Sequence, residues 1–183
     1  TPRIDAIAAD AVVFEAAYSP TPHTSYAITS LMTGKYMRPL LLQNLGADSE
    51  TWATHLRRHG YRTAAFYPPA VFFIDGDRFA TFRDTFLGFE YRKVEFADPQ
   101  KRADQVTAYL DRVPADKRLF LWVHLFDPHE PYEAHAEHPF GERDVDRYDS
   151  EVAAADAGIG GIVDAVRRVR PGANAHPVLS SRQ

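Results

Sequence analysis

The sequence of 183 residues contains no cysteine, which excludes disulfide bonds, thiolate metal sites and cysteine nucleophiles. It also has no excess of positive charge, since 21 Lys and Arg against 25 Asp and Glu give a formal net charge of −4. No nucleic-acid partner is therefore expected. No apolar run is long enough to span a membrane, and the first residues lack the pattern of a signal peptide. The remaining composition, 45% hydrophobic and 25% charged, is ordinary for a globular chain with one core.

Apolar segments of strand-like and helix-like periodicity alternate along the chain. Strands are expected at 11–17, 61–67, 89–96 and 119–125, and helices at 2–10, 24–33, 49–59, 98–111 and 146–169. The nearly unbroken apolar run at 119–125 is typical of a central parallel strand. The alternation predicts an α/β fold, with a mainly parallel sheet and helices on both faces. We expect residues 1–183 to form a single, incomplete domain, a piece of a longer protein, because Thr1 and Pro2 already read as the start of a helix.

The segment 18–35 places a hydroxyl group where α/β proteins tend to bind anions. Pro20 and Pro22 follow the predicted strand at 11–17 and favour an extended path. Thr24 or Ser25 then provides an N-cap for the helix, which Gly34 ends. The Thr24 hydroxyl is thus predicted at the positive end of a helix and at the carboxyl end of a strand. The alternative interpretation is that Thr24 serves only as a cap, which is the usual role of a threonine before a helix.

A second candidate region, 124–132, follows the strongest strand signal and contains two histidines and two carboxylates within seven residues. His129 is suited to donate a hydrogen bond to an anionic oxygen or to protonate a leaving group near neutral pH. The alternative is that His124 is a hydrogen-bonded core histidine and that the following residues form a polar turn. A zinc site is not favoured, because the spacing matches no standard zinc pattern.

Several blocks of the sequence together resemble the sulfatase family of the alkaline phosphatase superfamily. These blocks occur in the order of that family, at 1–8, 13–18, 24–36, 60–64, 120–132 and 148–156. The resemblance implies an alkaline phosphatase-like fold. It also places Thr24, counted back from Thr33 and Gly34, at the position of the family's nucleophile. His129 matches the histidine that contacts the sulfuryl or phosphoryl group, and we predict that His124 and Lys35 bind the substrate.

The sequence differs from the sulfatase pattern around the position of the nucleophile. Sulfatases use a cysteine or serine there that is converted to formylglycine, with a proline two residues later and an arginine four residues later. Here these later positions are Tyr26 and Ile28. Threonine yields no aldehyde on oxidation because its hydroxyl carbon carries a methyl group, so the nucleophile is expected to be threonine itself. Relatives with a threonine nucleophile resemble phosphotransferases and phosphodiesterases that act on phospho-substituted polymers and lipids.

The family resemblance implies one divalent metal ion, Ca, Mn, Mg or Zn. Its ligands would be Thr24, aspartates on a strand that precedes this chain, and an aspartate beside histidine or asparagine near position 183. No aspartate follows the stretch 175–181. We therefore expect the full-length protein, and not this chain alone, to hold the ion.

Two functional hypotheses follow. The first is a hydrolase or transferase that acts on an anionic sulfate or phosphate ester through Thr24 and is inactive as the isolated chain. The second is a non-catalytic, truncated module that binds a partner or an anionic polymer. Family members are often exported or membrane-tethered, and the sequence leaves the compartment and the oligomeric state open.

Overall fold

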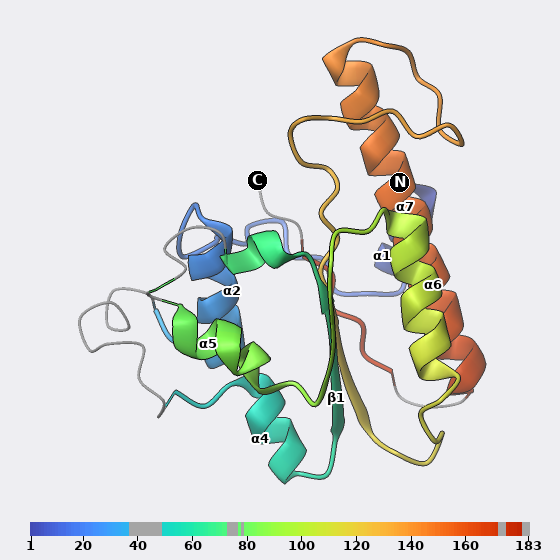
Figure 1. The fold of residues 1–183 in the computed structure, drawn as a ribbon. Helices are drawn as coiled ribbons and strands as arrows, with labels where there is room; N and C mark the ends of the chain where they lie inside the picture. Colours follow the sequence, from blue (N-terminus) through green and yellow to red (C-terminus); the bar gives the residue numbers. More distant parts are fainter. Residues whose placement is uncertain (37–48, 73–76, 78, 172–174, 181–183) are drawn as a thin grey trace. The chain divides into compact units, whose positions relative to one another are not determined.

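The computed structural model describes residues 1–36, 49–72, 77, 79–171 and 175–180 (Figure 1). The contacts of the chain divide it into two compact units. Unit 1 comprises Thr1–Glu15, Phe96–Ala115 and His124–Leu179, and unit 2 consists mainly of Ala16–Glu95 and Asp116–Val123. Each unit is described by itself below. The single partial domain expected for residues 1–183 stays a prediction.

Unit 2 contains a three-stranded parallel sheet in the order β2-β1-β3. Its strands are β1 (Arg62–Tyr67), β2 (Tyr91–Val94) and β3 (Leu119–Val123). In the middle of the sheet, Ala64 is aligned with Tyr91 on one side and with Leu121 on the other. Parallel neighbours require crossover connections, and helices supply them in this chain. The predicted α/β fold class with a parallel sheet is confirmed.

The order of the strands corrects one expectation. The run at 119–125 was expected to be central, yet among the described strands β1 is central and β3 lies at an edge. Five of the six residues of β1 are buried, whereas all five residues of β3 are half-buried. An unbroken apolar run indicates contact on both faces of a strand but does not determine its neighbours. The strand at 61–67 was predicted, but the small side chains of Ala64 and Ala65 make its sequence less hydrophobic than that of a typical central strand, so its central position was missed.

The remaining elements of unit 2 are short. They are α2 (Thr24–Thr33), α4 (Trp52–Arg58), α5 (Ala80–Asp84) and the 3-10 turns η1 (Pro69–Phe72) and η2 (Phe86–Gly88). The helix predicted at 24–33 is confirmed. The helix predicted at 49–59 begins at Trp52, because Thr51 caps it by accepting a hydrogen bond from the Thr54 backbone N–H. The connection expected at 37–48 lies outside the described residues.

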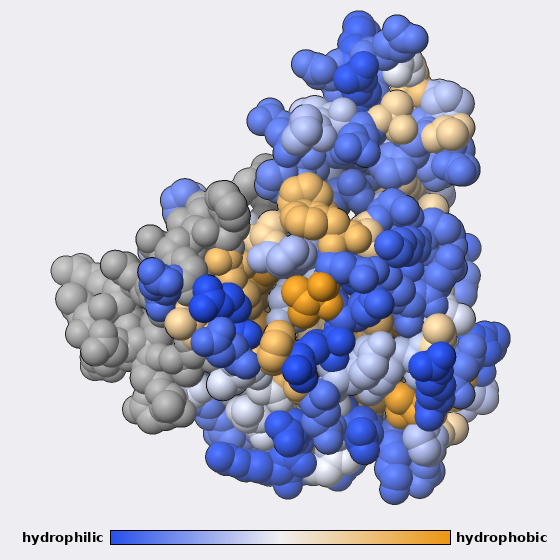
Figure 2. Space-filling model, in the orientation of Figure 1, coloured by the Kyte–Doolittle hydropathy of each residue, from blue (hydrophilic) through white to orange (hydrophobic). Residues whose placement is uncertain are grey.

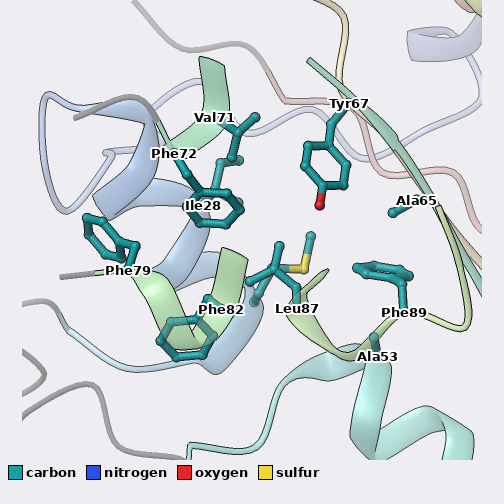
Figure 3. Close-up of a cluster of buried hydrophobic side chains, with 11 residues drawn as sticks. Ile28, Ala53, Ala65, Tyr67, Val71, Phe72, Phe79, Phe82, Leu87 and Phe89 are labelled. Atoms are coloured by element: carbon teal, nitrogen blue, oxygen red, sulfur yellow. The ribbon is translucent and has the colours of Figure 1, made fainter. Parts of the chain in front are cut away.

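An apolar cluster forms the core of unit 2 and joins α2 to the sheet (Figure 3). Its buried members are Ile28, Met32, Ala53, Ala65, Tyr67, Val71, Phe72, Phe79, Phe82, Leu87 and Phe89. The hydroxyl group of Tyr67 points into this cluster in Figure 3. Burial raises the pKa of Tyr67 to about 12, although the nearby Arg92 opposes the shift, so the phenol is neutral at physiological pH.

Unit 1 is built from α1 (Pro2–Ala8), α6 (Pro99–Leu110) and the long helix α7 (Asp144–Val169). Helices α6 and α7 lie side by side, and hydrophilic residues cover much of their displayed surface (Figures 1 and 2). Gly158 permits this close approach, because a Cβ at that position would lie 2.8 Å from the Cβ of Pro99. The helices predicted at 2–10, 98–111 and 146–169 are confirmed with shifted ends.

The strand predicted at 11–17 is wrong. This segment has no regular secondary structure, and it pairs with no strand of the described residues. Val12 and Phe14 are 81% and 79% exposed. A short apolar run becomes a strand only when a neighbouring edge accepts its backbone hydrogen bonds, and composition alone does not show that such an edge is present.

Candidate functional site

Thr24 is the first residue of α2 rather than its cap. The N-cap position is His23, which has extended backbone angles and provides no side-chain cap. The predicted capping role of Thr24 or Ser25 is therefore wrong. Thr24 is half-buried, and its hydroxyl makes no hydrogen bond to any residue that the structure describes. The hydroxyl group thus remains available at the positive end of the helix dipole.

The residues beside Thr24 fix the start of α2. The Ser25 hydroxyl donates a hydrogen bond of 2.7 Å to the backbone carbonyl of Val71, and both groups are buried. One turn later, the Thr29 hydroxyl donates to the Ser25 carbonyl, also at 2.7 Å. Ile28 and Met32 anchor the same helix in the apolar cluster. The position of the candidate nucleophile is therefore set by buried neighbours and not by Thr24 itself.

Lys35 lies at the other end of α2. Gly34 adopts a left-handed conformation with φ 66° and ends the helix, and the Lys35 ammonium group donates to the Ser49 hydroxyl at 3.2 Å. The ten residues of α2 correspond to a helix of about 15 Å. A ligand that contacts both Thr24 and Lys35 must therefore extend along the helix, and the substrate-binding role of Lys35 stays a prediction.

His129 belongs to the loop of unit 1 that precedes α7, and its side chain is exposed. Its ring stacks on Phe126 with the ring centroids 4.3 Å apart. Its Nδ1 lies 2.7 Å from the carbonyl oxygen of Glu130. Because a carbonyl only accepts hydrogen bonds, Nδ1 carries a proton in this arrangement. The other ring nitrogen, Nε2, remains to bind a ligand or to take up a second proton.

A buried carboxylate on α7 holds this loop. Glu151 is 1% exposed and accepts hydrogen bonds from the backbone N–H groups of His129 at 3.0 Å and Glu133 at 2.8 Å. One residue earlier, the Ser150 hydroxyl accepts from the His135 backbone N–H at 2.8 Å. Sequence reasoning missed Glu151 as a site residue. The available signal was its place on the face of α7 that buries Ala154, Ala155 and Gly158, where an unpaired charge would be costly.

Asp127 has a perturbed pKa in the same loop. Burial is the largest cause and raises the pKa of its carboxyl group to about 6, and the charge of Glu151 adds to the increase. The charge of His135 and a backbone hydrogen bond lower the pKa, and the charge of Asp98 is the smallest cause that raises it. A carboxyl group of this kind exchanges its proton near neutral pH rather than near pH 4.

His124 follows β3 directly and is half-buried. It interacts with other residues of the structure, so it is not a free histidine. Thr24 and Lys35 belong to unit 2, whereas His124 and His129 belong to unit 1. The structure brings His124 and His129 into one loop region and places Thr24 and Lys35 at opposite ends of one helix. Their predicted catalytic and substrate-binding roles stay predictions.

The described residues contain no group of three or more histidine, aspartate or glutamate side chains placed to hold a metal ion. Thr24 would contribute a single oxygen, whereas divalent cations in proteins take about four to eight ligands. The described part of the chain therefore does not by itself fit the divalent ion that the sequence resemblance implies. Separately, none of the helices in the described ranges is both long and apolar enough to cross a membrane.

Several solved structures share this fold at low sequence identity. The lipoteichoic acid synthase LtaP from Listeria monocytogenes matches with a TM-score of 0.62 and 13% identity, over 81% of this chain and 41% of its own. A protein in the alkaline phosphatase superfamily from Vibrio parahaemolyticus matches with a TM-score of 0.66 and 19% identity, over 92% and 45%. The protein BT33494S-sulf from Bacteroides thetaiotaomicron matches with a TM-score of 0.70 and 17% identity, over 92% and 51%.

These likenesses confirm the predicted alkaline phosphatase-like fold, and the chain spans about half the length of these structures. No curated protein matches the sequence. The decisive comparison is with families: the model of the Sulfatase family matches residues 1–175, almost the whole chain. The chain belongs to the Sulfatase family, as its motifs predicted.

Proposed function

We propose that residues 1–183 form the nucleophile-bearing part of a hydrolase or transferase that acts on a sulfate or phosphate ester. The observation that carries this proposal is the Thr24 hydroxyl at the first position of α2, which bonds to none of the residues that the structure describes and stands where the family resemblance expects a nucleophile. The helix dipole favours an anionic group at this end. The substrate is accordingly an ester whose sulfur or phosphorus carries negatively charged oxygens.

The proposed reaction has two steps. In the first step, the Thr24 oxygen forms a bond to sulfur or phosphorus and passes its proton to water, while the bond to the ester oxygen breaks and that oxygen leaves with the electron pair. In the second step, water or an acceptor hydroxyl takes the group from Thr24, which restores the free hydroxyl. Water gives hydrolysis, and an acceptor hydroxyl gives transfer.

His129 is proposed to assist the leaving oxygen. Nδ1 donates to the Glu130 carbonyl, so a second proton on Nε2 makes the ring a cationic donor. This donor can serve the leaving ester oxygen or the anionic oxygens of the transferred group. His124 and Lys35 are proposed to contact other parts of the substrate. The length of α2 between Thr24 and Lys35 favours an extended substrate such as a substituted polymer or lipid headgroup over a small ester.

A divalent ion would lower the pKa of the nucleophile and neutralise charge on the transferred group. Thr24 is the only ligand that we propose from residues 1–183, and the others are proposed to lie outside them. We accordingly expect the isolated segment to be inactive. The descriptions of two similar proteins support the proposed kinds of substrate. LtaP is described as a lipoteichoic acid synthase, and BT33494S-sulf belongs to a locus for the metabolism of glycosaminoglycans.

The test uses the intact protein with nitrophenyl sulfate, nitrophenyl phosphate and bis-nitrophenyl phosphate, in the presence and absence of Mn²⁺, Ca²⁺, Mg²⁺ or Zn²⁺. Thr24→Ala is expected to lower turnover by about a thousandfold or more, as expected for loss of a nucleophile, without changing thermal stability. Thr24→Ser is the matched control and should retain activity, because it keeps the hydroxyl. Turnover that survives in Thr24→Ala would remove Thr24 from the mechanism.

The same experiment tests the second hypothesis, a non-catalytic module that binds a partner or an anionic polymer. That hypothesis predicts no turnover of any of the three esters by the intact protein, with or without metal ions. It further predicts retained binding of a sulfated or phosphorylated polymer, measured by calorimetric titration. Turnover that depends on Thr24 would exclude it.

A further inference from the structure

Helix α7 carries two buried carboxylates with the same bonding pattern. Glu151 accepts from the backbone N–H groups of His129 and Glu133. Asp156 is 3% exposed and accepts from the backbone N–H groups of Arg3 at 3.0 Å and Ile4 at 2.8 Å, which lie in the first turn of α1. Both carboxylates therefore hold a second segment of unit 1 through backbone donors. They differ in that only Glu151 holds the loop of His129.

A carboxylate is the group that this arrangement requires. Both of its oxygens accept, so each can take one backbone N–H, and the negative charge strengthens both bonds. The amide of glutamine accepts at one oxygen only and would turn its NH₂ group toward the other N–H. The isosteric change of Glu151 to glutamine therefore breaks one of the two bonds while it leaves the shape of the side chain almost unchanged.

The bonds to Glu151 fix the backbone at His129 itself and four residues later at Glu133. The N–H of His129 and the N–H of Glu133 both donate to one carboxylate, which closes the five-residue segment 129–133. Within this segment, the Glu130 carbonyl accepts from Nδ1 of His129, and the ring of Phe126, which precedes the segment, stacks on the His129 ring. The orientation of the ring, and hence the direction of Nε2, depends on the backbone that Glu151 holds.

We propose that Glu151 is a positioning residue for His129. Its ionised carboxylate holds the loop so that Nδ1 is bonded to the Glu130 carbonyl and Nε2 is presented to an anionic ligand. The consequence for turnover rests on the proposed function, but the effect on the geometry of His129 does not. Asp156 supplies the comparison, because a purely structural role would make the two carboxylates equivalent.

The experiment compares E151Q with D156N in the intact protein. The first measurement is hydrogen exchange of backbone amides. E151Q is expected to accelerate exchange at His129 and Glu133 by about tenfold to a hundredfold through the lost charge-assisted bond. D156N is expected to accelerate exchange at Arg3 and Ile4 and to leave His129 unchanged. The second measurement is the NMR signal of the His129 ring, which should shift in E151Q only.

Turnover gives a third, separate readout. E151Q is expected to lower kcat for the best of the nitrophenyl esters by about tenfold to a hundredfold and to change the pH profile, whereas D156N should leave both unchanged at a temperature where each variant is folded. E151D keeps the charge but is one methylene shorter, so it should give intermediate exchange rates and activity. E151D also replaces E151Q in every comparison if E151Q does not fold.

The outcomes separate the two proposals. Unchanged exchange at His129 and an unchanged ring signal in E151Q would overturn the positioning role, whatever the activity. Equal changes at His129 in E151Q and D156N would also overturn it, because they would show general loosening of unit 1. Changes at His129 in E151Q alone, in a protein that turns over none of the esters, would support the positioning role and count against the proposed function.

Discussion

The helix that carries Thr24 is fixed mainly by apolar contacts, whereas the loop that carries His129 is fixed by hydrogen bonds to a buried carboxylate. Ile28 and Met32 bury one side of α2 in the cluster of unit 2. In unit 1, Glu151 holds the backbone of His129 through its charge. Apolar packing changes little with pH, but a carboxylate works as a double acceptor only when it is ionised. The two candidate catalytic groups should therefore respond to different perturbations.

The largest expected effect comes from emptying the apolar cluster. Phe79 is 0% exposed, and its ring packs edge-to-face against Tyr26 of α2 with the ring centroids 4.9 Å apart. Phe79→Ala should lower the free energy of unfolding by about 3–5 kcal/mol, as is typical of buried phenylalanine. Chemical denaturation measures this change. Phe14→Ala is the matched control at an exposed position, and it should cost less than about 0.5 kcal/mol. A similar cost at both positions would contradict the described core.

A smaller effect is expected from the polar anchor of α2. Ser25→Ala removes the donor that the buried Val71 carbonyl accepts from, and it should destabilise the protein by about 1–2 kcal/mol. Because Ser25 follows Thr24 directly, the change should also loosen the first turn of α2. Hydrogen exchange of the amides of that turn and thermal unfolding would check both effects. Ser19→Ala, at an exposed hydroxyl outside any helix, provides the comparison and should leave stability unchanged.

The sequence predicted a helix or strand better where its bounds depend on nearby residues than where they depend on distant ones. The helix 24–33 was predicted with its observed bounds, and its end at Gly34 has a local cause; its start was predicted from a cap at Thr24 or Ser25, whereas the N-cap is His23. The strand at 11–17 was wrong, because a strand depends on a distant edge that composition does not show. The central place of β1 was missed for a similar reason, since strand order is a property of the whole sheet.

The candidate site shows the same limit. Thr24 and His129 were predicted as site residues because they lie in blocks that resemble a family; the match over residues 1–175 confirms that family, and the roles of the two residues stay predictions. Glu151 was not found, because its partners lie 22 and 18 residues away in the sequence. Bonds from a side chain to a distant backbone leave no pattern of residue types. Only a charged residue on an otherwise buried helix face indicated that such partners exist.

The pH dependence of unit 1 should contain a contribution from Asp127. Its pKa is about 6 in the folded protein and roughly 4 in an unfolded chain. The folded protein therefore binds more protons between these values, so this group destabilises the protein as the pH rises from about 4 to about 6. Asp127→Asn, which cannot ionise, should avoid that loss.

We expect Asp127→Asn to be more stable than the parent by about 1 kcal/mol at pH 7.5, after allowance for solvent that reaches the side chain. The two proteins should be about equally stable at pH 4. Denaturation at a series of pH values gives the difference directly and removes the contributions of all other groups. An advantage of the variant that is larger at pH 4 than at pH 7.5 would show that the ionised carboxylate is stabilised, in conflict with its burial beside Glu151.

The smallest expected effect comes from an exposed ion pair of unit 1, and it tests whether burial is what makes Glu151 important. Arg168 of α7 donates to Asp111 at the end of α6 at 2.9 Å, and both side chains are about half exposed. A double-mutant cycle with Arg168→Gln and Asp111→Asn should give a coupling of about 0.2–1 kcal/mol that high salt removes. A larger, salt-resistant coupling would mean that ionic contacts stabilise unit 1 whether or not they are buried. The contrast between Glu151 and the surface pairs would then no longer hold.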